Sequence, residues 1–247
     1  MGGMDWDVAI ARADQLSSRH KSAADLLFFY RAVVRFQKEI YHRVKAHPKA
    51  DAQKLDTQML SAFFPDFIQL VEKYGPPELV AQAAKFQDRQ DWEQILHSCW
   101  QQTHERLEVI ARAILQPYVQ YLAERWHVEV GGLAEGSGSC PFCSRAPIVS
   151  VLNGQRLLIC SLCSHEWTFS EKICPGCHAD KIETLRHRSY PHLKSEACTS
   201  CGHYLKTVDL RKDAAAVPLV DEIASTELDK QSRERGFVKL EVNVAGQ

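Results

Sequence analysis

Eight of the nine cysteines fall within residues 140–201, where they form four Cys-x-x-Cys pairs. The pairs are Cys140 and Cys143, Cys160 and Cys163, Cys174 and Cys177, and Cys198 and Cys201. Such a pair places two thiolates on one side of a tight loop, and two pairs supply the four sulfurs of a tetrahedral metal site. The first two pairs are separated by 16 residues and the last two by 20, which is typical of four-cysteine ribbons. The sequence therefore predicts two metal ions, zinc or iron, because ligand spacing does not distinguish these metals.

Consecutive pairing would place the first four cysteines in one site and the last four in the other. A crossed arrangement, first pair with third and second with fourth, stays open. Consecutive pairing is favoured by Asn153-Gly154, which lies between strand-like residues 147–152 and 155–160. That dipeptide suits a two-residue hairpin turn with positive φ at both positions, and the hairpin would return the chain to its first cysteine pair.

Other residues near the pairs have simpler interpretations. His165, His178 and His203 could each replace a sulfur, but four cysteines already complete each shell, so we expect them at the surface or bonded to backbone. Three aromatic residues are expected to form the small ribbon core: Phe142, Trp167 and Tyr204. Cys99 stands apart from the pairs and is expected to be a buried apolar residue.

The elements that must carry these loops differ between the two parts of the chain. Residues 5–128 have helical periodicity, clearest in an apolar stripe from Leu107 to Leu122 that predicts a helix with one buried face. Ser22 and Asp25 have the spacing of a capping box, so a helix is expected from Ser22 to His47-Pro48. Shorter helices are expected at 60–74, 78–86 and 92–100.

A change of composition at Gly131-Gly132 predicts a domain boundary near residue 135. The fold class is therefore α+β: a helical domain at 1–135, a first metal ribbon at 136–169 and a second at 170–212. The ribbons are expected to be two copies of one rubredoxin-like or zinc-ribbon module. Residues 213–247 are expected to form a helix at 219–233 and a short strand at 238–244.

Composition excludes several classes of protein. The formal net charge is −1, without the cationic excess that nucleic-acid binding normally requires. No segment approaches the roughly 18 apolar residues of a membrane span, and the acidic start is unlike a secretory signal. A reduced cytoplasmic protein is the expectation, which favours metal over disulfides. The sequence has no phosphate loop and no paired acid and base, so we expect no enzyme. A zinc-ribbon nucleic-acid-binding protein and a thiol redox or sulfur-handling protein are the alternatives.

The four cysteine pairs, followed by the acidic segment Pro218-Leu-Val-Asp-Glu-Ile-Ala, resemble the formate dehydrogenase accessory protein FdhE family over residues 140–235. The resemblance implies a cytoplasmic assembly factor that contacts the catalytic subunit of a formate dehydrogenase. It also implies that the eight cysteines from Cys140 to Cys201 bind iron in rubredoxin-like sites, with zinc as the alternative.

Overall fold

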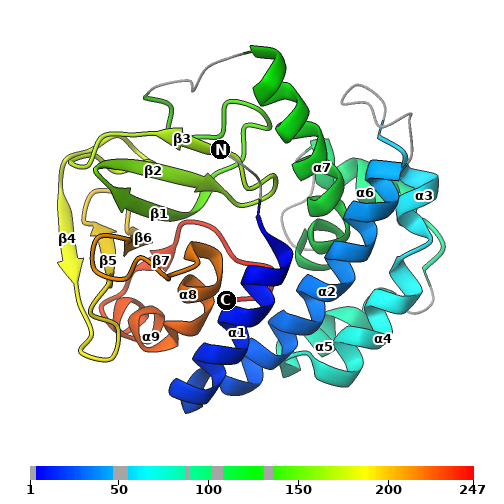
Figure 1. Cartoon of the computed structure of the whole chain (residues 1–247), viewed down its shortest axis with the longest axis horizontal. Helices are drawn as coiled ribbons and strands as arrows, with labels where there is room; N and C mark the ends of the chain where they lie inside the picture. The colour runs from blue at the N-terminus through cyan, green and yellow to red at the C-terminus, as the bar shows by residue number, and fades with distance from the viewer. Residues whose placement is uncertain (1–3, 47–54, 87–88, 102–107, 131–135) are drawn as a thin grey trace.

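The computed structural model describes residues 4–46, 55–86, 89–101, 108–130 and 136–247 (Figure 1). A helical part comes first in the chain and a sheet with two further helices follows, which confirms the predicted α+β class. The expected helix end at His47-Pro48, the first stripe residue Leu107 and the boundary near residue 135 lie outside the described residues. The helices of the first part are α1 (Trp6–Arg19), α2 (Ala24–Ala46), α3 (Thr57–Ser61), α4 (Phe64–Tyr74), α5 (Pro77–Ala83), α6 (Trp92–Gln101) and α7 (Glu108–Val130).

The capping box predicted at Ser22 is not formed. A short 3-10 turn occupies Lys21–Ala23, and α2 begins only at Ala24. The Ser22 hydroxyl donates to a carboxylate oxygen of Glu227, far along the chain, instead of capping its own helix. Ser22 therefore bonds to a distant residue and not to the backbone of its own helix, and the helix starts two residues later than expected.

The prediction of a single buried face on α7 is wrong. Every residue from Ile110 to Gln120 is buried, because α7 packs against α2, α4 and α6 at the centre of the helical part. Its polar side chains have partners in the interior: Gln116 accepts from Gln37 at 2.8 Å, and Arg112 donates to Glu241 at 2.7 Å. The apolar stripe thus marks only the most hydrophobic side of a helix that is enclosed all round from Ile110 to Gln120, although Arg125 further on is exposed.

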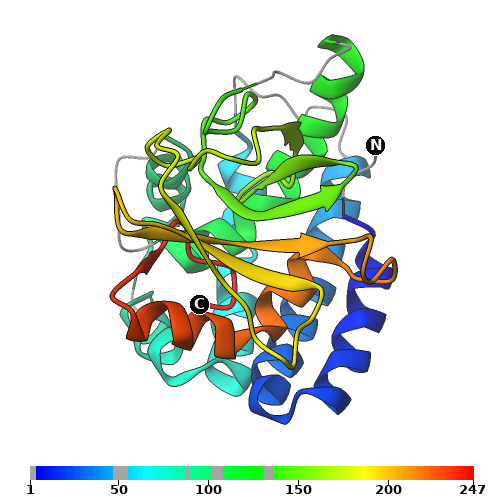
Figure 2. The ribbon, with the colours of Figure 1, turned by 90° about the vertical axis from the view of Figure 1, so that its left-hand side faces the viewer.

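The second part of the chain is built on one sheet, which Figure 2 shows above α8 and α9. Its strand order is β3-β2-β1-β6-β5-β4, with β7 also paired to β6. The strands are β1 (Pro147–Asn153), β2 (Gln155–Cys160), β3 (Glu166–Thr168), β4 (Ile182–Leu185), β5 (Leu193–Cys198), β6 (His203–Asp209) and β7 (Val238–Lys239).

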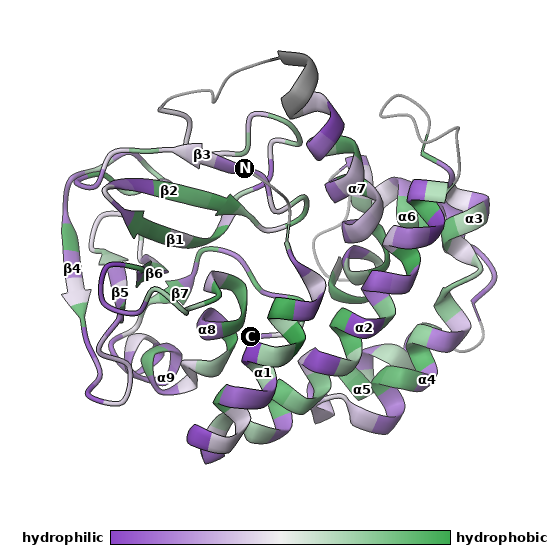
Figure 3. Ribbon diagram, in the orientation of Figure 1, coloured by the Kyte–Doolittle hydropathy of each residue, from purple (hydrophilic) through white to green (hydrophobic). Residues whose placement is uncertain are grey.

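Strands from both predicted ribbons meet in this sheet. The strands of residues 147–168 are antiparallel to one another, as are those of 182–209, and β1 joins β6 in parallel through Ser150 opposite Thr207. Figure 3 shows β1 and most of β2 as strongly hydrophobic, in keeping with strands covered on both faces. The division of the chain at 135, 169 and 212 stays a prediction.

The expected β1–β2 hairpin is present, but its turn is tighter than predicted. Asn153 pairs with Gln155 across the turn, and of the two central residues only Gly154 has positive φ, at +80°. Asn153 completes β1 instead, so a single glycine reverses the chain. This works because glycine has no Cβ to oppose a left-handed backbone.

The C-terminal segment differs from its prediction in two places. The helix expected at 219–233 is two helices, α8 (Pro218–Ala224) and α9 (Thr226–Glu234), which are separated at Ser225. Ser225 is fully buried and donates its hydroxyl to the Glu222 carbonyl at 2.8 Å, so it closes α8 locally. The strand expected at 238–244 is only Val238–Lys239, because Asn243 accepts from the backbone of Ala245 and Gln247 and forms a turn.

One hydrophobic core extends from the helices into the first cysteine loops. It includes buried residues of α1, α2 and α7 together with Leu158, Trp167 and the cysteine side chains at 140, 160 and 163. Helix α8 contacts α1 and α2 on one side and β1 and β6 on the other. The helices therefore support the sheet from which the cysteine loops project.

Candidate metal centres

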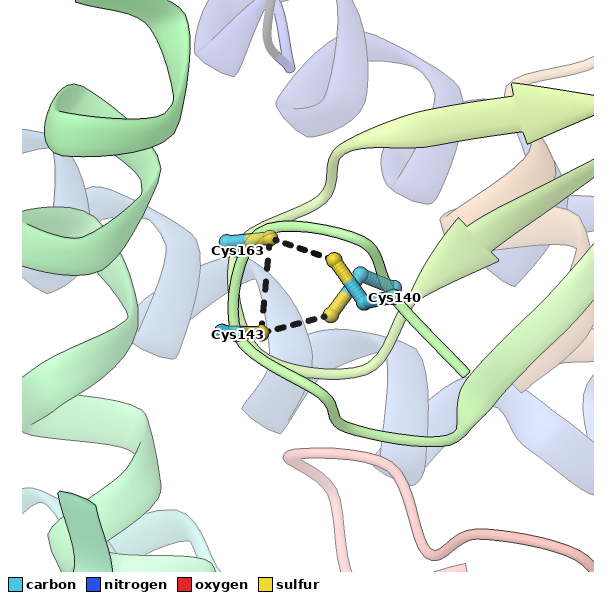
Figure 4. A group of neighbouring side chains, drawn as sticks. Cys140, Cys143 and Cys163 are labelled. Atoms are coloured by element: carbon cyan, nitrogen blue, oxygen red, sulfur yellow. Dashed lines mark hydrogen bonds between the residues drawn. The ribbon is translucent and has the colours of Figure 1, made fainter. Parts of the chain in front are cut away.

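The first cysteine cluster forms where the loop before β1 meets the loop after β2. The Cys140 and Cys163 sulfurs are 3.5 Å apart, those of Cys143 and Cys160 are 3.3 Å apart, and those of Cys143 and Cys163 are 3.7 Å apart. Figure 4 shows the labelled Sγ atoms of Cys140, Cys143 and Cys163 turned toward one another. The antiparallel β1–β2 hairpin causes this meeting because it brings its two ends together.

The second cluster repeats this arrangement around β4 and β5. The sulfurs of Cys174 and Cys201 are 3.8 Å apart, and those of Cys177 and Cys198 are 3.6 Å apart. All nine cysteines lie within the described ranges, and none of them forms a disulfide. In each cluster the four sulfurs lie within 4.8 Å of one another, so the cysteines group consecutively and not in the crossed arrangement.

The four cysteine loops have the same backbone conformation at one position. The residue after the second cysteine of each pair has positive φ: 59° at Ser144, 56° at Ser164, 61° at His178 and 74° at Gly202. At Ser144, His178 and Gly202 the backbone N–H donates to the carbonyl of the first cysteine of the pair, at 2.8–2.9 Å. This reversal turns both sulfurs of a pair to the same side.

Sequence reasoning missed this feature, because only the glycine at 202 signals a left-handed residue. The other three positions carry Ser or His, which adopt positive φ at a cost of about 1–2 kcal/mol. Such strain persists only where the surrounding structure enforces it.

Backbone N–H groups also point at the sulfurs. Leu162 donates its N–H to Cys160 Sγ at 3.4 Å, and Gly176 donates to Cys174 Sγ at 3.3 Å. Hydrogen bonds of this kind stabilise negative charge on sulfur and tune the metal that the sulfur binds.

The thiols of the first cluster cannot all ionise by themselves. The pKa of Cys140 lies well below its ordinary value because the neighbouring thiols donate to its sulfur, while burial raises the pKa of Cys160 and Cys163. A bound divalent cation removes this conflict, since a coordinating thiol is deprotonated outright. The donor set therefore fits a thiophilic cation.

The same electrostatics hold in the second cluster. Burial raises the pKa of Cys174 to about 12. Burial also raises the pKa of Cys198, but backbone N–H groups of Cys201 and Ser200 and the neighbouring thiols together outweigh it and lower this pKa to about 7.

The sulfur separations fit a tetrahedral metal site. Metal–sulfur bonds of about 2.3 Å place tetrahedral sulfurs about 3.8 Å apart. Five of the sulfur pairs are 3.3–3.8 Å apart, and all four sulfurs of each cluster lie within 4.8 Å of one another. Two four-cysteine clusters could therefore hold two metal ions. Zinc and iron both accept tetrahedral sulfur ligands, so this geometry does not choose between them.

The three nearby histidines lie outside both four-donor groups of the described chain. His165 is buried with its ring 5.4 Å from Trp126, His178 is exposed and supplies a left-handed backbone, and His203 begins β6. The expected surface position therefore holds for His178 but not for His165, which is buried, and the absence of histidine ligands stays a prediction.

The expected ribbon core is confirmed for two of its three aromatic residues. Trp167 and Tyr204 are buried, and Phe142 is partly buried against Trp126. Cys99 is also buried, as predicted.

A third group of possible ligands was not predicted. His192, Asp213 and Asp221 bring their polar atoms together, but the Arg12 guanidinium lies among them. Arg12 donates to Asp221 at 2.9 Å and to Asp213 at 2.8 Å, and the side chains of Arg12 and Asp221 are almost fully buried. The guanidinium already supplies the positive charge, so this cluster joins α1 to α8 and is not a metal site.

Known proteins are similar to this chain in sequence and in fold. Residues 160–245 match the family model "FdhE, C-terminal domain". The resemblance to the FdhE family is thereby confirmed. A "Protein FdhE homolog" of Aquifex aeolicus is 26% identical over 222 residues, which cover 82% of this chain and 75% of the relative.

For other FdhE homologs, this chain matches a smaller share of the relative's length. The relative from Haemophilus ducreyi is 36% identical over 42% of this chain and 37% of its own. The relative from Actinobacillus pleuropneumoniae (serotype 3) is 30% identical over 71% of this chain and 57% of its own.

The crystal structure of the FdhE protein from Pseudomonas aeruginosa has the same fold. It superposes with a TM-score of 0.68 over 98% of this chain and 97% of the other, at 23% sequence identity. None of the helices in the described part of the chain combines the length and hydropathy needed to cross a membrane.

Proposed function

We propose that this chain is a cytoplasmic maturation factor for a formate dehydrogenase and that it works without catalysing a reaction itself. The eight cysteines from Cys140 to Cys201 hold two ions, and the protein acts by contacting the catalytic subunit of its target. The proposal is supported by the FdhE family match and by two clusters whose sulfur separations suit tetrahedral coordination. Iron is the favoured metal because the family resemblance implies rubredoxin-like sites, and zinc is the alternative.

The observation that carries this proposal is the grouping of all eight paired cysteines into two four-sulfur clusters. A shell of four thiolates leaves no open position for a substrate, so the ions would stabilise the fold or carry electrons. In such a protein, the function lies in the surface that the ions help to form.

The first test is elemental analysis with an absorption spectrum of protein purified without oxygen. We expect about two ions per chain, with intense visible absorption if they are iron and none if they are zinc. A folded protein that contains no metal would overturn the metal assignment.

The second test is a binding assay between purified protein and a purified formate dehydrogenase catalytic subunit from the same cell. We expect a complex that survives size-exclusion chromatography, and we expect Cys140→Ala to weaken it by disturbing the first cluster. If the catalytic subunit fails to bind the metal-loaded protein, the proposed partner is wrong.

A further inference from the structure

The two clusters differ in how far the protein encloses them. In the first cluster, the exposed fractions of Cys140, Cys160 and Cys163 are 2%, 0% and 1%, and Cys143 is partly exposed. In the second cluster, Cys174 and Cys198 are buried, but Cys177 is exposed and Cys201 is partly exposed. Two sites with the same donor set therefore have different access to solvent.

The residues between the paired cysteines account for this difference. In the first cluster these positions include Phe142, whose ring is 5.4 Å from that of Trp126 on α7, and Leu162, which is 1% exposed. The corresponding positions in the second cluster are Gly176 and Ser200, and both are exposed. Large apolar side chains thus hold the first pair of loops against the core, whereas the small residues of the second pair leave Cys177 exposed, although the Leu240 side chain lies against Gly176.

The two clusters also differ in how they contact the hydrophobic core. Cys140, Cys160 and Cys163 of the first cluster are part of the main hydrophobic core. Within the described residues, no cysteine of the second cluster is part of this core or of the smaller core beside the sheet. A hollow of about 600 Å³ lies between the two clusters, lined by Ser139 and Ser144 beside the first and by Gly176 and His178 beside the second. It borders both clusters, so the difference in access comes from the burial of the cysteines themselves.

We infer that the second cluster is an exchangeable metal centre open to an incoming thiolate ligand, whereas the first is a closed structural centre. This inference rests on the proposed function, since it requires both clusters to bind metal. It adds a division of roles between two sites that have the same four ligands.

The exchange step follows from the exposure of Cys177. An incoming thiol loses its proton and its sulfur bonds to the ion as the bond between the ion and Cys177 Sγ breaks. Cys177 then takes up a proton, so the ion keeps four sulfur ligands and its charge. No electron is transferred. The same step at the first cluster requires the core around Phe142 and Leu162 to open first.

The test uses the full-length protein loaded with Zn²⁺ and challenged with the coloured chelator 4-(2-pyridylazo)resorcinol. We expect two release phases of about one ion each, with the fast phase about tenfold or more faster than the slow one. Cys177→Ser should remove the fast phase and leave the slow one unchanged. Cys143→Ser, at the matching position of the first cluster, should remove the slow phase and leave the fast one.

A second readout needs no variant and covers the case in which a substituted chain fails to fold. Zinc-loaded protein is treated with N-ethylmaleimide, and the labelled cysteines are identified by mass spectrometry over time. We expect Cys177 to be labelled first and Cys160 and Cys163 last. Release of two ions in a single phase, or labelling of the first cluster before the second, would overturn the inference while leaving metal binding intact. A protein that binds no ion at all would instead overturn the proposed function.

Discussion

Substitution of Lys206 by methionine tests whether the charged interior beneath the sheet stabilises the fold. Lys206 is fully buried, and its ammonium group lies 2.6 Å from Asp229 Oδ2 and 3.0 Å from Glu222 Oε1. Lys239 contacts the same Glu222 carboxylate. Burial lowers the pKa of Lys206, but the two carboxylates outweigh this effect and raise it above its ordinary value. The network thus contains two cations and two anions, all enclosed.

The cost of the substitution follows from this charge balance. Lys206→Met keeps the apolar stem but leaves two buried carboxylates with one cation. Breaking a buried pair in this way costs about 3–5 kcal/mol because the remaining charge is desolvated without a partner. The deficit should shrink as the pH falls, since desolvation favours the neutral form of a carboxylate that has lost its cation.

The assay is urea unfolding of the zinc-loaded protein, followed by tryptophan fluorescence. Lys38→Met is the matched control, because Lys38 forms an ion pair with exposed Asp7, and we expect it to cost less than about 1 kcal/mol. The double variant Lys206→Met/Asp229→Asn removes one charge of each sign and should recover part of the loss. If Lys206→Met and Lys38→Met destabilise the protein equally, the charged network does not contribute as we have argued.

Three further predictions concern the cysteine loops and the junction between helices and sheet. Cys140→Ala should reduce bound metal from about two ions to about one, whereas Cys99→Ala should retain both and cost only about 1 kcal/mol; equal metal loss in the two would contradict the ligand assignment. Gly202→Ala should cost about 1–2 kcal/mol in urea unfolding with metal content unchanged, because its φ is +74° and no atom lies within 4 Å of the added Cβ. Burial raises the pKa of Asp221, but hydrogen bonds from His192 and Arg12 outweigh this effect and lower that pKa overall. The ionised Asp221 carboxylate therefore stabilises the folded protein above about pH 4, and this stabilisation is lost as the pH falls through the pKa of Asp221 in the folded state. Asp221→Asn should therefore flatten the acid limb of the stability curve relative to the unsubstituted protein, and parallel acid limbs would refute the assignment.

The cysteine clusters were predictable because their information is local. Cys-x-x-Cys spacing fixes two sulfurs on one loop, and the turn at Asn153-Gly154 indicated which loops meet. The periodicity of residues 5–128 likewise indicated helices, since amphipathic spacing depends only on neighbouring residues. The left-handed residues after each pair were not predictable at Ser144, Ser164 and His178, because side chains other than glycine do not mark that conformation.

Features that depend on distant partners were missed or wrongly placed. The capping box at Ser22 failed because Glu227 takes the hydroxyl, and the single helix expected at 219–233 ends early at buried Ser225. The apolar stripe of α7 gave no sign that Arg112 and Gln116 would also be enclosed. At Ser22 and in α7 the deciding partners are distant in the sequence, whereas Ser225 bonds the nearby Glu222 carbonyl and only its burial depends on the fold.

The amino-acid sequence by itself determined which residues could bind metal and that helices precede the cysteine loops, because both depend on spacing along the chain. Only the tertiary structure decided that strands β1 and β6 join in one sheet and that the first cluster is more enclosed than the second, where Cys177 is exposed. Burial depends on which surfaces pack together. Phe142 packs against Trp126 of α7 beside the first cluster, whereas Gly176 at the matching position of the second has no side chain and lies against Leu240 instead.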